Sequence, residues 1–380
     1  MRILLVNWQD RTNPQAGGAE VHLHEIFGRL AARGHEVHLL CSGYAGAPDS
    51  DVIDGIRVHR VSSRYGFALR GRGAFARLAA ALRPDVVVED VNKVPLNLPL
   101  IWKGPFVLLV PHLFGATAFR ELPAPVAAVV WAKERPMSRV YARASVHAIS
   151  RSTGDDLMAR GFRSEAVRVI YPGVDTARFK PDPLTEREDE PTFLYVGRLK
   201  RYKQVDVAIR AVWLLRSSLE GSTGIRVRMW VAGDGDDRGR LERLARRLGV
   251  EDRVTFFGHV SEERKLDLYR RSWAAVLPSL KEGWGITNLE AAACGTPAVG
   301  ANNSAIAESI RHGETGYCFR TSDAQELAAL LGTLAARPAL RDQLGRAARD
   351  FAETFSWERT ATETESHLVA AVSSPRGPEA

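Results

Sequence analysis

The feature that most constrains the fold is an alternation of short apolar runs with longer amphipathic segments, which occurs twice along the 380 residues. Apolar runs of about four to eight residues are typical of buried strands, and amphipathic segments are typical of helices. Strands that alternate with helices form parallel sheets, because a parallel pair needs a crossover connection. The two series occupy residues 3–171 and 192–336. The sequence therefore predicts two α/β domains facing each other, which the chain length allows.

In the first series, a strand at residues 3–7 leads through a long loop to Gly17 and Gly18, which begin a helix with an apolar face. This order of strand, glycine turn, helix and strand is the first unit of a doubly wound sheet, with the glycines where a phosphate-binding turn lies. Tight packing of a helix on a sheet also needs glycine, so the pair by itself is ambiguous. We expect further strands at residues 36–41, 56–61, 85–89, 106–110, 146–150 and 167–171, and helices over residues 64–83, 116–143 (as a pair) and 152–160.

Between the two series the composition changes to Asp, Glu, Pro, Arg and Thr, as is typical of a linker. The chain from Ser373 on is rich in Pro, Ser and Gly and is expected to be disordered. In the second series we expect strands at residues 192–196, 225–232, 254–257, 274–277 and 298–300, and helices over residues 205–219, 239–248, 262–271, 305–310 and 323–336.

Composition indicates a globular protein, with 45% hydrophobic and 26% charged residues. No run of about 18 apolar residues is found, and the apolar start of the chain is too short for a signal peptide, so we expect a cytoplasmic protein.

The formal net charge of +7 fits an anionic small ligand, a membrane surface or nucleic acid. Five arginines and no acidic residue lie between Arg64 and Arg83, which indicates either a solvated helix face or a contact with an acceptor or a membrane. The three cysteines are too far apart for a zinc site or a disulfide framework.

The most informative motif runs from Glu282 to Glu290 and crosses from the end of a strand into a helix. Gly283 and Gly285 let the backbone approach a ligand, and the helix start offers N–H groups and a positive dipole end to an anion such as a diphosphate. The two carboxylates are able to accept hydrogen bonds from a sugar at one end of the diphosphate and from a ribose at the other. The alternative is an ordinary capped helix whose two glutamates face solvent.

Other candidate residues also follow predicted strands. Arg198 and Lys203 come after the strand at residues 192–196, where cations are able to clamp a diphosphate, although surface cations are common. His112 follows the strand at residues 106–110 and is equally well explained as a structural histidine. The Asp-Gly-Asp sequence that begins at Asp234 is interpreted as a turn rather than a metal site. The chain has no Gly-x-Ser-x-Gly elbow, no P-loop and no third glycine of a dinucleotide motif, which weakens acyl transfer, ATP hydrolysis and dehydrogenation.

Taken together with Pro172-Gly-Val-Asp175 and Gly258-His-Val260, these motifs resemble the retaining glycosyltransferase family 4, of the GT-B fold, over roughly residues 1 to 370. Trp284 stands where the family more often has phenylalanine, and no asparagine separates Pro172 from Gly173, which bears on the subfamily rather than on activity.

The resemblance implies two doubly wound Rossmann-like domains that face each other across a donor cleft. The expected boundaries are 1–172 for the acceptor-side domain, 173–190 for the linker, 191–349 for the nucleotide-sugar domain and 373–380 for the tail. A C-terminal helix at residues 350–368, which Trp357 anchors, crosses back to the first domain.

The resemblance also implies roles for individual residues. Four are expected to act in catalysis: His112, Glu282, Arg198 and Lys203. Arg198 and Lys203 are expected to bind the diphosphate, together with backbone N–H groups of Gly17, Gly18, Gly285, Ile286 and Thr287. Glu282 is expected to hold hydroxyls of the sugar and Glu290 those of the ribose. Val260 and Leu277 are expected near the base, and His112 is expected to stabilise the transition state.

The implied reaction moves a hexosyl group with retention from a nucleoside diphosphate sugar, with UDP first and GDP-mannose second, to a hydroxyl acceptor. It needs no metal and no other cofactor. The acceptor is expected to be anionic or lipid-linked, as in cell-envelope polysaccharide or glycolipid assembly, or else a small secondary metabolite. We also expect a peripheral contact with a membrane, and we do not expect binding to nucleic acid. The alternatives are a sugar-nucleotide epimerase on the same fold and a non-catalytic sugar-nucleotide-binding module.

Overall fold

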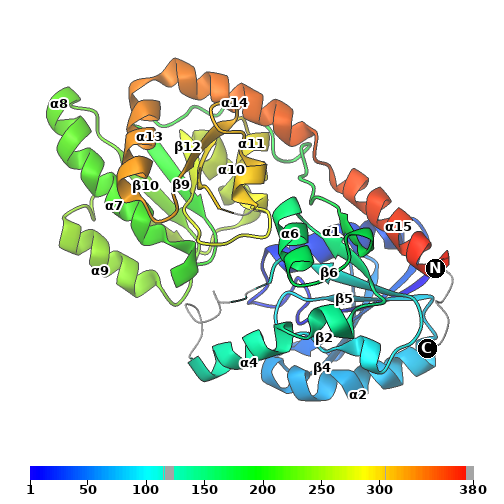
Figure 1. The fold of residues 1–380 in the computed structure, drawn as a ribbon. Coiled ribbons are helices and arrows are strands. Elements are labelled where there is room, and N and C mark those ends of the chain that lie inside the picture. The colour runs from blue at the N-terminus through cyan, green and yellow to red at the C-terminus, as the bar shows by residue number, and fades with distance from the viewer. Residues whose placement is uncertain (114, 116–123, 304, 374–380) are drawn as a thin grey trace. The chain divides into compact units, whose positions relative to one another are not determined.

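The computed structural model of the chain describes residues 1–113, 115, 124–303 and 305–373. The chain divides into two compact units (Figure 1). Unit 1 comprises Met1–Gly173 together with the chain from Trp357 on, and unit 2 comprises Val174–Ser356. Each unit contains one mainly parallel sheet with helices packed on it, which confirms the expected pair of doubly wound α/β units.

Unit 1 is built on an eight-stranded sheet in the order β3-β4-β2-β1-β5-β6-β7-β8. All neighbouring strands are parallel except β3 and β4. Its strands are β1 Arg2–Val6, β2 Glu36–Gly43, β3 Ser50–Ile53, β4 Ile56–Ser63, β5 Val86–Asp90, β6 Phe106–Val110, β7 Ser145–Ala148 and β8 Val167–Val169; its helices include α1 Gly18–Ala32, α2 Arg64–Leu82, α4 Ala124–Glu134, α5 Met137–Val140, α6 Arg151–Ala159 and α15 Trp357–Ser373.

The order of strands reverses at β1, which pairs with β2 on one side and with β5 on the other. The last four residues of β1, from Ile3 to Val6, are apolar and buried because helices cover both faces of the sheet: α2 lies on one side, and α1 and α15 on the other (Figure 1). Ligand sites of open α/β sheets lie where the strand order reverses. The loops that leave β1 and β5 are therefore the part of unit 1 most suited to carry function.

Strand β3 was not predicted from the sequence. It is a short, exposed edge strand that pairs with β4 through a turn at Asp54 and Gly55, both of which have positive φ. An Asp-Gly pair is a strong hairpin signal, but the four residues before it lack an apolar face. The strand exists because β4 offers an unpaired edge, which is a tertiary effect.

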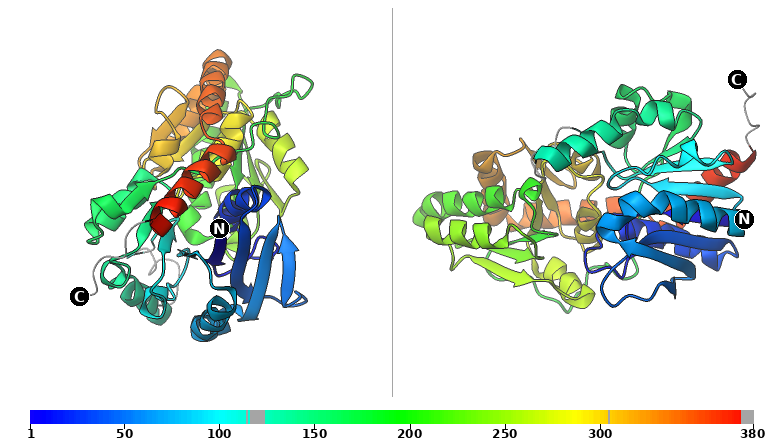
Figure 2. Two further views of the ribbon diagram at one scale, coloured as in Figure 1. Left: turned by 90° about the vertical axis from the view of Figure 1, so that its right-hand side faces the viewer. Right: turned by 90° about the horizontal axis from the view of Figure 1, so that it is seen from below.

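The last helix, α15, packs beside α1 within unit 1 (Figure 2). The Arg33 guanidinium donates to Glu365 at 2.6 Å, and the ring centroid of Trp357 lies 5.9 Å from that of His22. The predicted start of this helix near residue 350 is wrong, because residues 350–353 complete the preceding helix and turn hydrogen bonds then break the helical run. The expected tail lies outside the described residues, apart from Ser373.

Unit 2 has a six-stranded parallel sheet in the order β11-β10-β9-β12-β13-β14. Here the strand order reverses between β9 and β12. Its strands are β9 Thr192–Val196, β10 Arg228–Ala232, β11 Val254–Gly258, β12 Ala274–Leu277, β13 Ala298–Ala301 and β14 Gly316–Phe319; its helices include α7 Val205–Leu215, α8 Gly221–Thr223, α9 Arg238–Leu248, α10 Glu262–Arg271, α11 Ile286–Ala293, α12 Ile306–Ser309, α13 Ala324–Ala336 and α14 Pro338–Glu353, with a π-helical turn at Arg216–Glu220 after α7.

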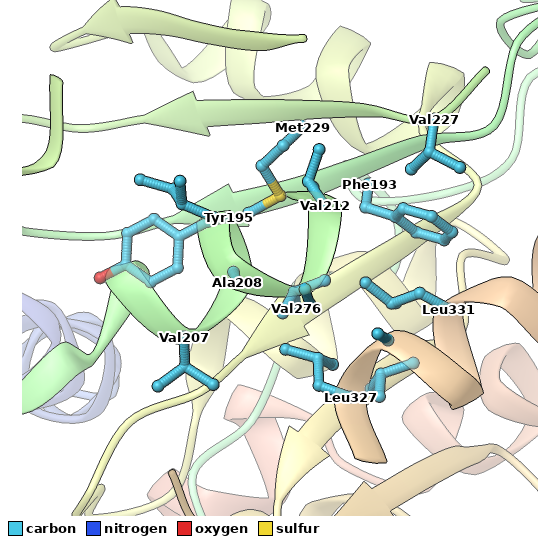
Figure 3. Close-up of a cluster of buried hydrophobic side chains, with 14 of the residues drawn as sticks. Phe193, Tyr195, Val207, Ala208, Val212, Val227, Met229, Val276, Leu327 and Leu331 are labelled. Atoms are coloured by element: carbon cyan, nitrogen blue, oxygen red, sulfur yellow. The ribbon is translucent and has the colours of Figure 1, made fainter. Parts of the chain in front are cut away.

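The core of unit 2 fills the space between the sheet and helices α7 and α13 (Figure 3). Phe193 of β9, Met229 of β10 and Val276 of β12 face Val212 of α7 and Leu331 of α13, and all five are buried. Burial of side chains of this size contributes about 1.5–3 kcal/mol each. This packing holds the ends of β9 and β12 in a fixed relation, on which the candidate site depends.

Most predicted strands and helices of both units agree with the structure to within a few residues. Strand β14 and helix α14 were not predicted, and part of the segment 116–143 lies outside the described residues. Within the ranges that the structure describes, no helix combines the length and the apolar character needed to cross a membrane.

Candidate functional site

Two loops meet at the point where the strand order of unit 2 reverses. One follows β9 and contains Gly197 to Lys203, and the other follows β12 and contains Pro278 to Gly285. The backbone N–H of Leu280 donates to the carbonyl oxygen of Tyr202 at 2.7 Å, so the loops are joined. Because β9 and β12 are neighbours in the sheet, the loops at their carboxyl ends, which are predicted to carry functional residues, lie side by side.

An ion pair between Lys203 and Glu282 bridges the two loops. The side chains are only 15% and 17% exposed, and the Ser279 hydroxyl donates to the same carboxylate oxygen at 2.7 Å. Burial would lower the pKa of Lys203, but the carboxylate of Glu282 and the neighbouring Tyr202 and Tyr195 raise it above its ordinary value. The site thus presents a permanently charged ammonium next to a carboxylate that is able to accept hydroxyl hydrogen bonds.

Arg198 lies in the same loop, and its side chain is exposed to solvent. The Tyr195 hydroxyl donates to the Arg198 carbonyl oxygen at 2.9 Å, which fixes the backbone below the guanidinium. Gly197 contacts Gly233 of the adjacent loop so closely that a Cβ on Gly233 would lie 1.9 Å from the Gly197 carbonyl oxygen. The loop is therefore held rigidly while the arginine itself remains available to an anion.

Helix α11 begins at the end of the second loop. Gly285 has φ +93°, a left-handed conformation that favours glycine, and among the described residues no side chain caps the helix. The first turn, which includes Ile286 and Thr287, therefore offers backbone N–H groups and the positive end of a helix dipole. The Asn288 amide donates to Ser309 at 2.8 Å and 3.0 Å, which anchors this helix start.

Glu290 lies one turn further along α11 and is largely buried. It accepts hydrogen bonds from the Lys265 ammonium at 3.0 Å and the Tyr269 hydroxyl at 2.9 Å, both on α10. Burial raises the pKa of the Glu290 carboxyl, whereas Lys265 and Tyr269 oppose that rise. The alternative that Glu290 simply faces solvent is therefore wrong.

Of the two residues expected near a nucleotide base, Val260 follows strand β11 and Leu277 is the last residue of β12. These two strands are separated in the sheet by β10 and β9. Leu277 is buried and Val260 is half-buried. Sheet pairing therefore does not bring them together.

In unit 1, Gly17 and Gly18 stand at the start of α1, and His112 follows β6. The Gly17 N–H donates to the Glu20 carboxylate at 2.7 Å, and the backbone of Gly17 is extended, with φ −151°. Any residue adopts this conformation, so the turn does not itself require glycine at position 17. His112 is half-buried at the end of its strand.

The acidic turn near Asp234 pairs with basic side chains. Asp236 forms an ion pair with Lys200, and the Arg240 guanidinium donates to both oxygens of Asp237 at 2.6 Å. These contacts agree with the interpretation of this segment as a turn.

Sequence reasoning missed three residues that support the site: Ser279, Lys265 and Tyr269. Ser279 stands just after a strand, which was a usable signal. Nothing in the sequence pattern marks the other two, because their contacts arise from the packing of α10 against α11.

Two family models match the chain in succession: "Glycosyltransferase Family 4" over residues 16–178 and "Glycosyl transferases group 1" over residues 177–351. Glycogen synthase of Mycobacterium tuberculosis is 30% identical, in a match that covers 100% of this chain and 97% of that protein. Among solved structures, sucrose-phosphate synthase from Thermosynechococcus elongatus superposes with a TM-score of 0.82 at 22% identity, covering 97% of this chain and 99% of the other. The Anabaena protein Alr3699/HepE, in complex with UDP-glucose, gives a TM-score of 0.79 at 20% identity, covering 97% and 100%.

Proposed function

The chain belongs to the GT-B glycosyltransferases of the family 4 type, and from that premise we propose that it transfers a hexosyl group, with retention, from a nucleoside diphosphate sugar to a hydroxyl acceptor. Membership in this family makes the chain a hexosyltransferase, as the sequence predicted. The function of an epimerase and that of a non-catalytic binding module are therefore not proposed for this chain.

The observation that carries the proposal is the buried pair of Lys203 and Glu282 at the switch point of unit 2. We assign the diphosphate to Lys203, the exposed Arg198 and the N–H groups at the start of α11. The departing diphosphate gains negative charge as the glycosyl bond breaks, so fixed cations and amides aimed at it lower the barrier. Because Arg198 and Lys203 supply positive charge at this point, the proposed reaction needs no metal.

Glu282 is assigned to hydroxyls of the transferred sugar, Glu290 to the ribose, and Val260 and Leu277 to the base. Glu282 already accepts hydrogen bonds from Lys203 and Ser279. A carboxylate in this setting is better suited to binding the hydroxyl groups of the sugar than to acting as a nucleophile. Retention then follows from attack of the acceptor hydroxyl on the same face. In that step the new glycosidic bond forms as the bond to phosphate breaks, and the acceptor proton passes to the departing phosphate oxygen.

From unit 1, we assign a Gly18 N–H, next to Gly17, to a phosphate oxygen and His112 to the stabilisation of the transition state. His112 stands at the carboxyl end of a central strand, which is where open α/β sheets place functional side chains. These assignments are tested separately from those of unit 2.

A UDP-linked donor is the first choice and GDP-mannose the second. The complex of the Anabaena protein with UDP-glucose supports this order, since that protein shares the fold.

For the acceptor we propose an anionic or lipid-linked molecule, as in cell-envelope assembly, with a small secondary metabolite as the second choice. The arginines of α2, a helix with no acidic residue, support the anionic acceptor.

The test is a thermal-shift panel of UDP, GDP, TDP and ADP and their common sugar conjugates, with EDTA and again with magnesium. Saturating donor is expected to stabilise the protein by roughly 2 to 4 kcal/mol. The nucleotide that stands out is then used in a transfer assay in which NMR identifies the anomer formed. An inverted product would overturn the retaining assignment, and the absence of any nucleotide effect would overturn the donor site.

A further inference from the structure

Among the described residues, the two side chains that donate hydrogen bonds to the Glu290 carboxylate belong to one neighbouring helix, α10, which packs against α11 (Figure 1). Lys265 and Tyr269 lie four positions apart, so they share one face of that helix. The Lys265 ammonium donates to Oε1 at 3.0 Å and the Tyr269 hydroxyl to Oε2 at 2.9 Å. Each carboxylate oxygen therefore has one protein donor of its own.

The two donors are themselves held in place. Lys265 also contacts Glu262 at 2.9 Å and lies 5.2 Å from the ring centroid of Phe179. Tyr269 is buried, and its ring centroid lies 6.2 Å from that of Phe179 in a T-shaped arrangement. Because both partners are fixed, the plane of the Glu290 carboxylate is fixed as well.

A carboxylate has about four lone-pair sites, two on each oxygen. One site of each oxygen is taken by α10, which leaves each oxygen able to accept one further hydrogen bond. Two hydroxyls on adjacent carbons match two neighbouring oxygens of this kind. The geometry suits a vicinal diol better than a single hydroxyl or a cation.

The charges of this cluster support the same conclusion. Burial raises the pKa of Glu290, and the ammonium of Lys265 counteracts it. Burial would likewise lower the pKa of Lys265, but Glu290 and Glu262 raise it above its ordinary value. A buried carboxylate without this cation would take up a proton more readily and would lose acceptor capacity.

We propose that Lys265 is a positioning residue that, together with Tyr269, holds Glu290 as a two-oxygen receptor for the 2′- and 3′-hydroxyls of the donor ribose. This inference rests on the proposed function, because it takes Glu290 to be the ribose ligand. It adds a cause, the contact of α10 with α11, and a consequence, the selection of ribonucleotides over 2′-deoxyribonucleotides.

The experiment compares the affinities of UDP and 2′-deoxy-UDP, or of GDP and 2′-deoxy-GDP if the native protein binds GDP more tightly, by calorimetric titration. The native protein is expected to favour the ribonucleotide by about 10-fold or more, since hydrogen bonds to a charged group are among the stronger ones. In Lys265→Met the preference is expected to fall to about 1- to 3-fold, because the carboxylate loses its charge partner and its orientation. The matched control is Arg264→Met on the same helix, whose exposed guanidinium pairs with Asp267.

The possible outcomes distinguish a failure of the donor site from a failure of the role of Lys265. A native protein that binds neither UDP nor GDP overturns the proposed function and this inference with it. Tight binding with no preference for ribose, or a preference that Lys265→Met retains in full, overturns the inference and leaves the donor site standing. If Lys265→Met does not fold, Tyr269→Phe removes one donor with little change of shape, and its ribose preference then decides the matter in the same way.

Discussion

The ammonium of Lys203 and the carboxylate of Glu282 form a largely buried ion pair although they stand 79 positions apart in the chain. They meet because β9 and β12 are neighbours at the point where the strand order reverses. In the proposed mechanism each has its own task, the first toward the diphosphate and the second toward the sugar.

Replacing Lys203 by Met removes the buried cation of the diphosphate site. We expect the affinity for the preferred nucleoside diphosphate to fall by about 10- to 100-fold, since a charge-assisted hydrogen bond to phosphate is lost. Titration of the folded variant measures the change. The control is Lys200→Met in the same loop, whose ammonium pairs with Asp236 at the surface and which should bind normally. Native affinity in Lys203→Met would exclude the phosphate clamp.

Glu282→Gln keeps the shape of the side chain and removes its charge. If Glu282 binds sugar hydroxyls, kcat/KM should fall by about 10- to 1000-fold while nucleoside diphosphate affinity changes little. Ser279→Ala should show a smaller loss, because it removes one hydrogen bond to that carboxylate. The exposed Glu263→Gln serves as control. Detection by mass spectrometry of a glycosyl group covalently bound to Glu282 would show that it is a nucleophile instead.

His112→Ala tests the assignment in unit 1. We expect transfer to fall by about 100-fold or more, because an electrostatic contact with the transition state is lost, while donor affinity is retained. The matched control is His59→Ala, which removes another half-buried histidine of the same unit. Unchanged transfer by His112→Ala would remove His112 from the mechanism.

Three buried histidines of unit 1 are expected to make the protein sensitive to acid. His22 of α1, His147 of β7 and His367 of α15 form a chain with ring centroids 5.8 Å and 6.4 Å apart. Burial lowers the pKa of His22 to about 3 and that of His367 to about 4. It also lowers the pKa of His147 well below its ordinary value, and the other two histidines add to that effect.

The unfolded chain therefore binds more protons than the folded chain at pH values below about 6.5. Above that pH the three histidines do not reduce the free energy of unfolding, and they reduce it progressively as the pH falls toward 4. At pH 5 His22 and His367 each cost about 2 kcal/mol of unfolding free energy, which is large beside a typical total of about 5–15 kcal/mol. Urea midpoints at pH 7.5 and pH 5 measure the loss, and His367→Leu should reduce it whereas the exposed His312→Leu should not. Equal midpoints at the two pH values would contradict the prediction.

The two α/β units and most of their strands could be predicted from the sequence alone, because buried parallel strands are continuous apolar runs and the helices between them carry an apolar face. It also identified Lys203 and Glu282 as candidates, because each follows a predicted strand. Local signals failed at the edge strand β3 and at the break between α14 and α15. Strand β3 forms because it pairs with β4, although its sequence has no apolar face. Between α14 and α15, turn hydrogen bonds end the helix within a segment whose sequence pattern is helical.

Which of the candidate residues come together depends on the tertiary fold. The order of strands places β12 beside β9, and thereby Glu282 beside Lys203, although nothing in the chain between them specifies this neighbour. The packing of α10 on α11 likewise gives Glu290 two partners that no motif indicated. Contacts of this kind depend on how separate elements bury their apolar faces together, which is a property of the whole unit rather than of any one segment.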